Sequence, residues 1–242
     1  MTVLLDKGGL RARIATSPQD LAAAQQLRGL CFHGCGNDRD ALDARCTHVL
    51  IESRDGTLVS CFRMLHLMGR DISKSYSARY YDLTSLELYD GAMVELGRFC
   101  IRPGHAQDPD VLRVAWGALT AYVDRENVAL LFGCSSFAGT DAARYLDSFA
   151  VLKERHLAPA RWLPRIKAPN VFRFAGRLRR KPDMARALRN MPPLLRTYLM
   201  MGGWVSDHAV VDAEMNTLHV FTGVEISAIP AARKRLLRAV AS

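Results

Sequence analysis

Glu95 and Arg98 are the residues of this sequence whose types and spacing point most directly to chemistry. They lie inside an apolar stretch, residues 93–102, whose β-forming composition predicts a strand in the core of a sheet. Charges in a buried strand are costly unless they are paired or used, and Gly97 between them indicates a bulge or a close backbone approach. A carboxylate held in this way can act as a general base. The alternative is an ion pair on an exposed edge strand.

Asp40 and Asp43 form a second group of interest in an Asp-rich loop. Paired carboxylates can hold an ammonium group, so these two residues suit recognition of a cationic amino acid. The alternative is a turn in which the aspartates cap the following strand. Arg63 and Arg98 are candidates for binding a carboxylate. Arg98 can equally pair with Glu95 or an aspartate and only order the site.

Cysteine and histidine residues suggest no metal site. The residues that could suggest a zinc site are Cys31, His33, Cys35, Cys46 and His48. Their spacing lacks the C-x-x-C pairs of ordinary zinc sites. The six cysteines are scattered, which favours reduced thiols in a cytoplasmic protein. We therefore expect neither a metal nor a tightly bound cofactor.

Local signals predict the elements that position these residues. Strands are expected at residues 10–16, 47–52, 58–67, 93–102, 128–134, 208–211 and 217–224. Helices are expected from Ser17-Pro18 to about Phe32, from Asp108-Pro109 to about Asn127, from Thr140 or Asp141 to Leu152, and at 184–189, 194–201 and the C-terminus. Residues 69–91 are expected to be irregular, with one short helix near Leu83–Tyr89.

This order of elements predicts an α/β or α+β fold with a mixed sheet. A doubly wound dinucleotide fold is excluded, because no G-x-G-x-x-G motif follows the first strand. We expect one domain, residues 1–242, with a core at 10–153, a basic helical insertion at about 154–205, and closing strands with a helix at 206–242. No apolar run reaches the ~18 residues that span a bilayer, and no signal peptide is expected.

Positive charge is concentrated late in the chain, although the whole protein has a net charge of +9. Residues 153–196, called here the basic segment, contain 13 lysines and arginines against two acidic residues, hence a net charge of +11. Such a segment suits an anionic partner: a phospholipid surface, an acidic carrier protein or nucleic acid. Nucleic acid is disfavoured because no aromatic platform or helix-turn-helix accompanies the charge.

Several motifs follow one another in a specific order: Arg28 and Phe32, Asp40-x-x-Asp43, Arg63-Met64-Leu65, Glu95-Leu96-Gly97-Arg98-Phe99 and Phe132-Gly133-Cys134-Ser135-Ser136-Phe137. Together they resemble the acyl-homoserine-lactone synthase type of Gcn5-related N-acyltransferase. The later motifs Pro192-Pro193-Leu194-Leu195-Arg196, Gly202-Gly203-Trp204 and Asp207-His208-Ala209-Val210-Val211-Asp212 resemble another branch, the bacterial L-ornithine N-alpha-acyltransferases.

The resemblance implies a Gcn5-related acyltransferase fold, with a mixed, mostly antiparallel central sheet flanked by helices and a basic helical C-terminal elaboration. It also implies transfer of a 3-hydroxyacyl group from acyl carrier protein, through its 4'-phosphopantetheine arm, to the alpha-amine of ornithine. The product would be lyso-ornithine lipid, which a downstream O-acyltransferase would consume. Alternatives are the same chemistry on glutamine or another amino acid, an acyl-homoserine-lactone synthase, and a non-enzymatic basic module that binds lipid or nucleic acid.

One departure from the superfamily concerns the loop Pro103–Asp110, which has one glycine and two aspartates where a pyrophosphate-binding loop has closely spaced glycines. A helix N-terminus ordinarily favours anions, but these aspartates already occupy that field. Coenzyme A should therefore bind poorly, whereas the single phosphodiester of a carrier protein carries less charge.

Roles follow for the remaining candidates. Glu95 would accept the amine proton, and backbone N–H groups near Gly97–Phe99 would stabilise the oxyanion. Tyr145 resembles the family's general acid, with Ser135 or Ser136 as rivals and simple helix packing as the alternative. Residues expected to bind substrate are Arg28, Asp40, Asp43, Arg63, Arg98, Phe99 and Ser136.

The basic segment is expected to contact the carrier protein, an anionic membrane, or both. The residues expected to make that contact are Arg177, Arg179, Arg180 and Lys181. A cytoplasmic protein bound peripherally to the inner face of the membrane is the corresponding expectation.

Overall fold

The computed structural model describes residues 2–106 and 108–241. The chain divides into two compact units: unit 1 comprises Met1–His66, Leu96–Val128 and Ala231–Ser242, and unit 2 comprises Leu67–Glu95 and Ala129–Pro230. Strand β6 (Ala92–Ile101) carries both Glu95 and Arg98. Its first four residues belong to unit 2 and its last six to unit 1.

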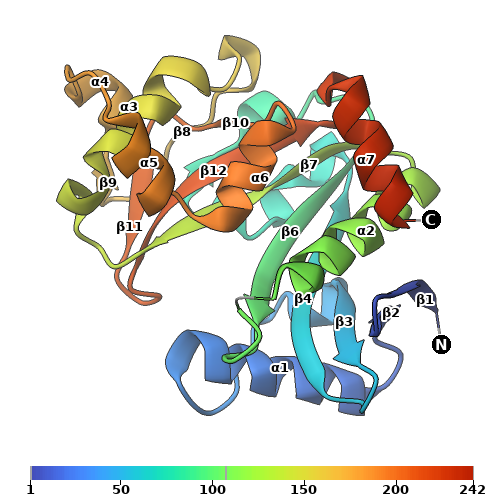
Figure 1. The fold of residues 1–242 in the computed structure, drawn as a ribbon. Helices are drawn as coiled ribbons and strands as arrows, with labels where there is room; N and C mark the ends of the chain where they lie inside the picture. Colours follow the sequence, from blue (N-terminus) through green and yellow to red (C-terminus); the bar gives the residue numbers. More distant parts are fainter. Residues whose placement is uncertain (1, 107, 242) are drawn as a thin grey trace. The chain divides into compact units, whose positions relative to one another are not determined.

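Unit 1 is built on strands in the order β1-β2-β3-β4-β6, with β1–β2, β2–β3 and β3–β4 antiparallel (Figure 1). The elements are β1 (Val3–Lys7), β2 (Leu10–Ile14), α1 (Pro18–His33), the 3-10 turn η1 (Asp43–Arg45), β3 (Thr47–Ser53), β4 (Leu58–Leu67), α2 (Pro109–Arg125) and α7 (Ala231–Ala241).

Helix α1 begins where its sequence directs it to begin. The Ser17 hydroxyl accepts a hydrogen bond from the Asp20 N–H at 3.1 Å, and the Asp20 carboxylate accepts one from the Ser17 N–H at 3.2 Å. These bonds satisfy N–H groups that have no partner inside the helix. The helix packs on the sheet through buried side chains of α1, β3, β4 and β6: Ala24, Leu27, Leu50, Cys61 and Cys100.

Unit 2 is built on strands in the order β6-β7-β12-β11-β9, with β10 also paired to β12. Its strands are β5 (Tyr81–Asp82), β7 (Val128–Ala138), β8 (Arg165–Ile166), β9 (Val171–Phe172), β10 (Trp204–Val205), β11 (Ala209–Asp212) and β12 (Thr217–Glu225). Its helices are α3 (Leu146–Arg155), α4 (Phe174–Arg177), α5 (Met184–Asn190) and α6 (Pro193–Met200). The 3-10 turns are η2 (Gly69–Lys74), η3 (Ser77–Arg79), η4 (Thr84–Leu86), η5 (Ala142–Tyr145), η6 (Ala160–Trp162) and η7 (Ile226–Ala228).

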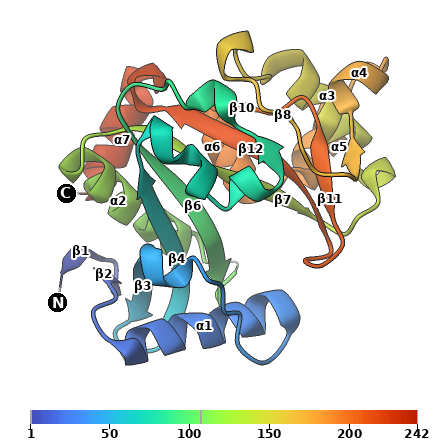
Figure 2. The same cartoon turned by 180° about the vertical axis from the view of Figure 1, so that it is seen from behind.

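The two faces of the unit 2 sheet are covered by different segments. Helix α6 lies over one face of β12 (Figure 1), where Leu218 and Val220 join a core with Leu195 of α6 and Ala187 of α5. The turns of residues 69–86 lie over the other face (Figure 2), and there the Tyr81 ring packs on Phe221 at 5.7 Å. Side chains alternate along a strand, so neighbouring residues of β7 and β12 face these two different environments.

The predicted mixed, mostly antiparallel sheet flanked by helices is confirmed, and most elements fall within a few residues of their expected positions. Three expectations were wrong in detail. Strand β1 precedes the predicted first strand, β7 continues to Ala138 instead of ending near Cys134, and the helix expected from residue 140 begins with a 3-10 turn. None of the helices in the described part of the chain has the length and apolar character needed to cross a bilayer.

Candidate active site

Glu95 lies in unit 2 with its carboxylate almost completely buried, at 4% exposure. One oxygen accepts hydrogen bonds from the Ser77 N–H at 2.7 Å and the Ser77 hydroxyl at 2.6 Å. The other accepts a bond from the Tyr76 N–H at 2.7 Å. Three donors on one carboxylate stabilise its ionised form. Glu95 is therefore a buried, supported anion.

The donors to Glu95 come from a turn that the sequence did not single out. The Ser75 hydroxyl accepts a hydrogen bond from the Ala78 N–H at 3.1 Å, which stabilises the start of η3 and orients the N–H groups of residues 76 and 77. The Ser77 hydroxyl also lies 3.4 Å from the Cys134 Sγ of β7. The sequence gives no periodic signal in residues 69–91, so only the tertiary structure brings this turn to Glu95.

Unit 1 contains a buried network of arginines and aspartates centred on Asp43. One oxygen of Asp43 accepts hydrogen bonds from Arg28 Nη1 at 2.8 Å and Arg63 Nη1 at 2.7 Å. The other accepts bonds from Gln25 at 2.9 Å, Arg28 Nη2 at 3.1 Å and the Asp40 N–H at 3.3 Å. Five donors exceed the roughly four lone-pair sites of a carboxylate. Direct binding of a substrate ammonium group by Asp43 stays a prediction, and it would require the ammonium to displace an arginine.

Asp38 and Asp40 complete the network by holding Arg98. Arg98 Nε donates to Asp38 Oδ2 at 2.9 Å, and its Nη2 lies 3.5 Å from Asp40 Oδ2. Asp38 also accepts from Arg28 Nε at 2.7 Å, and Asp40 accepts from Arg63 Nη2 at 3.0 Å. The predicted pairing of Arg98 with an aspartate is confirmed. Asp38 was missed as a member of this site, although it lies in the same Asp-rich loop.

The electrostatics of the network keep all three aspartates ionised. Burial alone would raise the pKa of Asp43, but hydrogen bonds from Arg28 and Gln25 outweigh burial and hold this pKa below its usual value. The pKa values of Asp38 and Asp40 are also lowered, with burial opposed by the neighbouring arginines. Three aspartates thus balance three arginines, and the network carries little net charge. Arg98 is its most accessible member, with a side chain 13% exposed.

The backbone of β6 departs from extended geometry at Arg98, whose φ is +53°. This left-handed conformation is unfavourable for a residue with a side chain. It follows Gly97, where an added Cβ would lie 3.6 Å from the Arg63 Nε. The irregularity expected around Gly97 is therefore present one residue later. Phe99 follows, and its ring stacks on Phe62 at 5.7 Å.

Tyr145 lies at the end of β7 that is away from Cys134 and Ser77. Its hydroxyl donates to the Ala138 carbonyl at 2.6 Å, at the far end of β7. Four residues of strand separate Ala138 from Cys134, the residue that meets the Ser77 hydroxyl, which is roughly 13 Å. The Tyr145 ring packs among Phe137 and Phe149. These contacts favour the helix-packing alternative, and the role of Tyr145 as general acid stays a prediction.

Ser135 and Ser136, the rival candidates, occupy opposite faces of β7. Ser135 is 4% exposed, and its hydroxyl accepts a hydrogen bond from Thr222 at 2.9 Å. Because side chains alternate, Ser135 lies on the face opposite Cys134 and Ser77. Ser135 is therefore also a poor candidate for the general acid. Ser136 lies on the same face of β7 as Cys134, and it is exposed. In the pairing of β7 with β12 its partner residue is His219.

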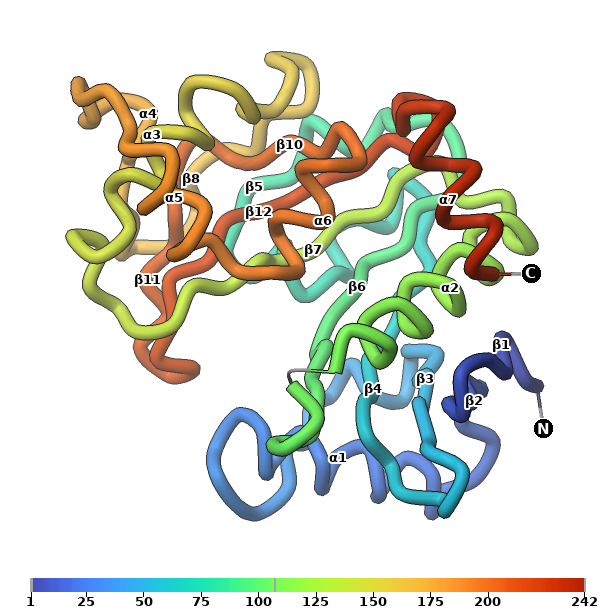
Figure 3. The backbone as a smooth tube through the Cα atoms, in the orientation of Figure 1, coloured from blue at the N-terminus to red at the C-terminus, as the bar shows by residue number. Residues whose placement is uncertain are grey.

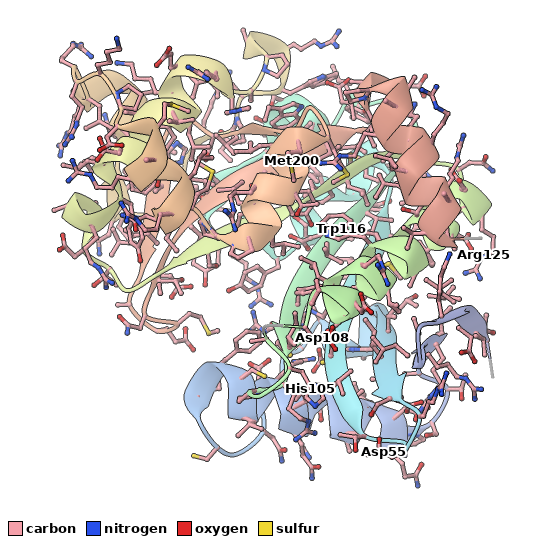
Figure 4. The ribbon with its side chains drawn as sticks, viewed as in Figure 1. Asp55, His105, Asp108, Trp116, Arg125 and Met200 are labelled. Atoms are coloured by element: carbon pink, nitrogen blue, oxygen red, sulfur yellow. The ribbon has the colours of Figure 1, made fainter. Side chains whose placement is uncertain are left out.

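The loop between β6 and α2 has the acidic helix start that its sequence indicates. The Asp108 carboxylate accepts a hydrogen bond from the Asp110 N–H at 2.9 Å and caps α2. Figure 4 shows Asp108 at this helix start and His105 in the loop before it. Gln107, also part of the predicted loop, lies outside the described residues. One of the N–H groups that would bind a phosphate is thus already occupied.

The cysteine and histidine cluster is dispersed among other contacts. Cys31 Sγ lies 3.4 Å from the Ile101 carbonyl, and His48 Nε2 lies 2.9 Å from the Asp43 carbonyl. Within residues 2–106 and 108–241, no three His, Cys, Asp or Glu side chains are grouped so that they can hold a metal ion.

Comparison with known proteins first defines the class. Residues 28–116 match the model of the acetyltransferase (GNAT) domain family. The structure of FeeM, an N-acyl amino acid synthase from uncultured soil microbes, superposes with a TM-score of 0.51 over 90% of this chain and 91% of FeeM, at 10% identity. The fold is therefore that of a Gcn5-related N-acyltransferase.

The particular family follows from the sequence relatives. An L-ornithine N(alpha)-acyltransferase of Rhodobacter capsulatus is 31% identical over 236 residues, which cover 90% of each chain. A protein with the same name from Brucella abortus is 28% identical, over 92% of this chain and 86% of that protein. This chain belongs to the L-ornithine N(alpha)-acyltransferase family.

Proposed function

We propose that this protein transfers a 3-hydroxyacyl group from acyl carrier protein to the alpha-amine of L-ornithine, producing lyso-ornithine lipid. The observation that carries the proposal is the match to the Rhodobacter relative along 90% of both chains. The match is long enough that it must include most of the basic C-terminal third. The names of both relatives support ornithine as the acceptor.

The helix start at α2 supports a carrier-protein donor. A helix N-terminus attracts phosphate through its unpaired N–H groups and its positive dipole. Here the carboxylates of Asp108 and Asp110 lie in that field, and Asp108 accepts one of the N–H bonds. The repulsion should be greater for the pyrophosphate and 3'-phosphate of coenzyme A than for a single phosphodiester.

In the proposed reaction, the neutral alpha-amine attacks the thioester carbonyl carbon. A C–N bond forms, the C–S bond breaks, and the products are an amide and the free pantetheine thiol. Glu95 accepts the proton that the amine loses, directly or through a water molecule. Backbone N–H groups near Gly97–Phe99 stabilise the oxyanion. The residue that protonates the leaving thiolate is not assigned, because Tyr145 and Ser135 have other partners.

We assign the substrate-binding roles in unit 1 to residues at the edge of the arginine–aspartate network. Arg98 is the member of the network best placed to bind the ornithine carboxylate, because its side chain is the least buried. Arg28 and Arg63, which Asp43 bridges, hold the two aspartates that pair with that guanidinium. Phe99 is a further proposed substrate-binding residue of unit 1, and Ser136 is one of unit 2.

The proposed partners follow from the proposed reaction. They are acyl carrier protein, an anionic membrane surface that receives the amphiphilic product, and an O-acyltransferase that consumes this product. The protein would act in the cytoplasm at the inner face of the membrane. The basic segment supplies the contact surface.

The test is mass spectrometry of lipids from a host that expresses the protein and is fed labelled amino acids. We expect a new lipid with a 3-hydroxyacyl amide of labelled ornithine. A lipid labelled from glutamine instead would change the acceptor. Formation of an acyl-homoserine lactone would change the reaction, and absence of any new acyl amide would refute the proposal.

A further inference from the structure

The part of the basic segment that contains α4 and α5 is held on α3 by one buried carboxylate. Asp147 of α3 is 4% exposed, and its two oxygens accept bonds from Arg180 at 2.8 Å and from Arg186 at 2.8 Å. It also accepts a bond from the Asp183 N–H at 3.1 Å. Figure 3 shows this stretch returning across α3. Arg180 and Arg186 are therefore bonded within the protein, and they hold this part of the basic segment on α3.

A second contact orients α5. The Ser148 hydroxyl donates to the Ala187 carbonyl at 2.8 Å, and the Ala187 side chain is completely buried. Because Ala187 faces inward, residues two positions away on the helix face outward. Arg189 therefore points away from α3, and it is exposed.

Four further cations of residues 177–189 are exposed and form no ion pair with the residues that the structure describes. Within the described part of the chain, no carboxylate oxygen lies within 4.0 Å of the side-chain nitrogens of Arg177, Arg179, Lys181 or Arg189, and all four residues are exposed. Among them, Leu188 is 46% exposed, and Arg196 Nη1 lies 3.4 Å from its carbonyl. Several unpaired cations within one short stretch of chain create a positive potential that attracts anions.

We propose that this surface, made of Arg177, Arg179, Lys181, Leu188 and Arg189, docks on an anionic phospholipid bilayer. The proposal rests on the proposed function, because an acylated amino acid is amphiphilic and must pass from the enzyme into a membrane. Lipid headgroups meet the distributed charge without requiring a matching set of acidic side chains. Leu188 adds apolar contact at the level of the headgroups. An acidic carrier protein is the competing partner, and the experiment distinguishes the two.

The test measures binding of the full chain to vesicles of mixed phosphatidylglycerol and phosphatidylcholine, and to vesicles of phosphatidylcholine alone. The variant combines Arg177→Gln, Arg179→Gln and Lys181→Gln. The matched control combines Arg45→Gln, Arg54→Gln and Arg70→Gln, three exposed arginines outside the surface that give the same change in net charge. We expect salt-sensitive binding to the anionic vesicles only, weakened roughly 100-fold in the variant, at about fivefold for each removed cation. The control should change binding only a few-fold.

Two kinds of outcome would overturn the proposal. One is an equal loss of binding in the variant and the control, or no binding to anionic vesicles at all. The other is a variant that binds vesicles normally but has a raised KM for the acyl carrier protein in vesicle-free solution, which would assign the surface to the carrier. Vesicle binding needs no substrate. A protein that binds vesicles through this surface but does not acylate ornithine would refute the proposed function and leave the surface assignment intact.

Discussion

Replacing Glu95 with glutamine separates catalysis by this carboxylate from its support of the neighbouring turn. The carboxylate accepts two hydrogen bonds on the oxygen facing Ser77, and its other oxygen accepts one from the Tyr76 N–H. A glutamine can keep its oxygen toward Ser77, but its NH2 group then faces the Tyr76 N–H, donor against donor. One charge-assisted bond is lost and two become ordinary bonds, so Glu95→Gln should lower the free energy of unfolding by about 3 kcal/mol.

That loss is small enough for the protein to remain folded at 25 °C, with a Tm lowered by roughly 6 to 12 °C. If Glu95 is the general base, kcat should fall on the order of 100- to 10,000-fold. The assay combines thermal unfolding with kcat for amide formation from an acyl carrier protein and ornithine. Both are measured well below the Tm of the variant.

The control is Ser77→Ala, which removes one donor and leaves the carboxylate in place. It should destabilise the protein by about 1 to 2 kcal/mol, while kcat stays within about tenfold of the unmodified protein. Full activity in Glu95→Gln would refute the role of Glu95 as base. If kcat falls in both variants in proportion to the loss of stability, the carboxylate only holds the turn and is not the base.

Three further predictions concern the arginine–aspartate network, His219 and Tyr145. Asp43→Asn leaves Arg28 facing an amide inside the buried network, so urea unfolding should show a loss of about 3 to 5 kcal/mol; a loss below 1 kcal/mol would mean that solvent supports the arginines. Burial lowers the pKa of His219 to about 4 in the folded protein, against 6.5 when it is unfolded. The unfolded state therefore takes up the proton first, and the free energy of unfolding should decrease by about 3 kcal/mol as the pH falls from about 6.5 to about 4. His219→Gln should flatten that decrease, and an unchanged slope would contradict the assignment. Tyr145→Phe removes the bond to the Ala138 carbonyl, so it should cost about 1 kcal/mol of stability and leave kcat within a few-fold; a 100-fold loss of kcat would restore Tyr145 as the general acid.

Elements with local signals were predictable from the sequence. Helix α1 begins at a serine followed by proline and an acidic residue, and α2 begins at Asp108-Pro109, so both starts depend on bonds within a few residues. Strand β6 was recognisable from its apolar, β-forming composition, and its buried charges marked it as a candidate site. The arginine–aspartate network was predictable in part for the same reason, since buried charges require partners of opposite sign.

Contacts that depend on tertiary structure were not predictable. The turn that supports Glu95 has no periodic pattern, and its hydrogen bonds to Glu95 join residues 18 or 19 positions apart. The position of Tyr145 was not predictable because β7 is longer than its uncharged run, which moves the following helix away from Cys134. The five donors to Asp43 come from α1, β4 and its own loop, so its saturation becomes apparent only when these segments are packed together.

The most direct test of the central claim is an assay of the purified protein with a 3-hydroxyacyl carrier protein and L-ornithine, in which mass spectrometry identifies the product and its acylated nitrogen. The proposed function predicts a 3-hydroxyacyl amide on the alpha-nitrogen, formed from the carrier-bound donor and not from the corresponding coenzyme A ester. Acylation of the side-chain amine, preference for glutamine, or turnover with the coenzyme A ester at an equal rate would each contradict it.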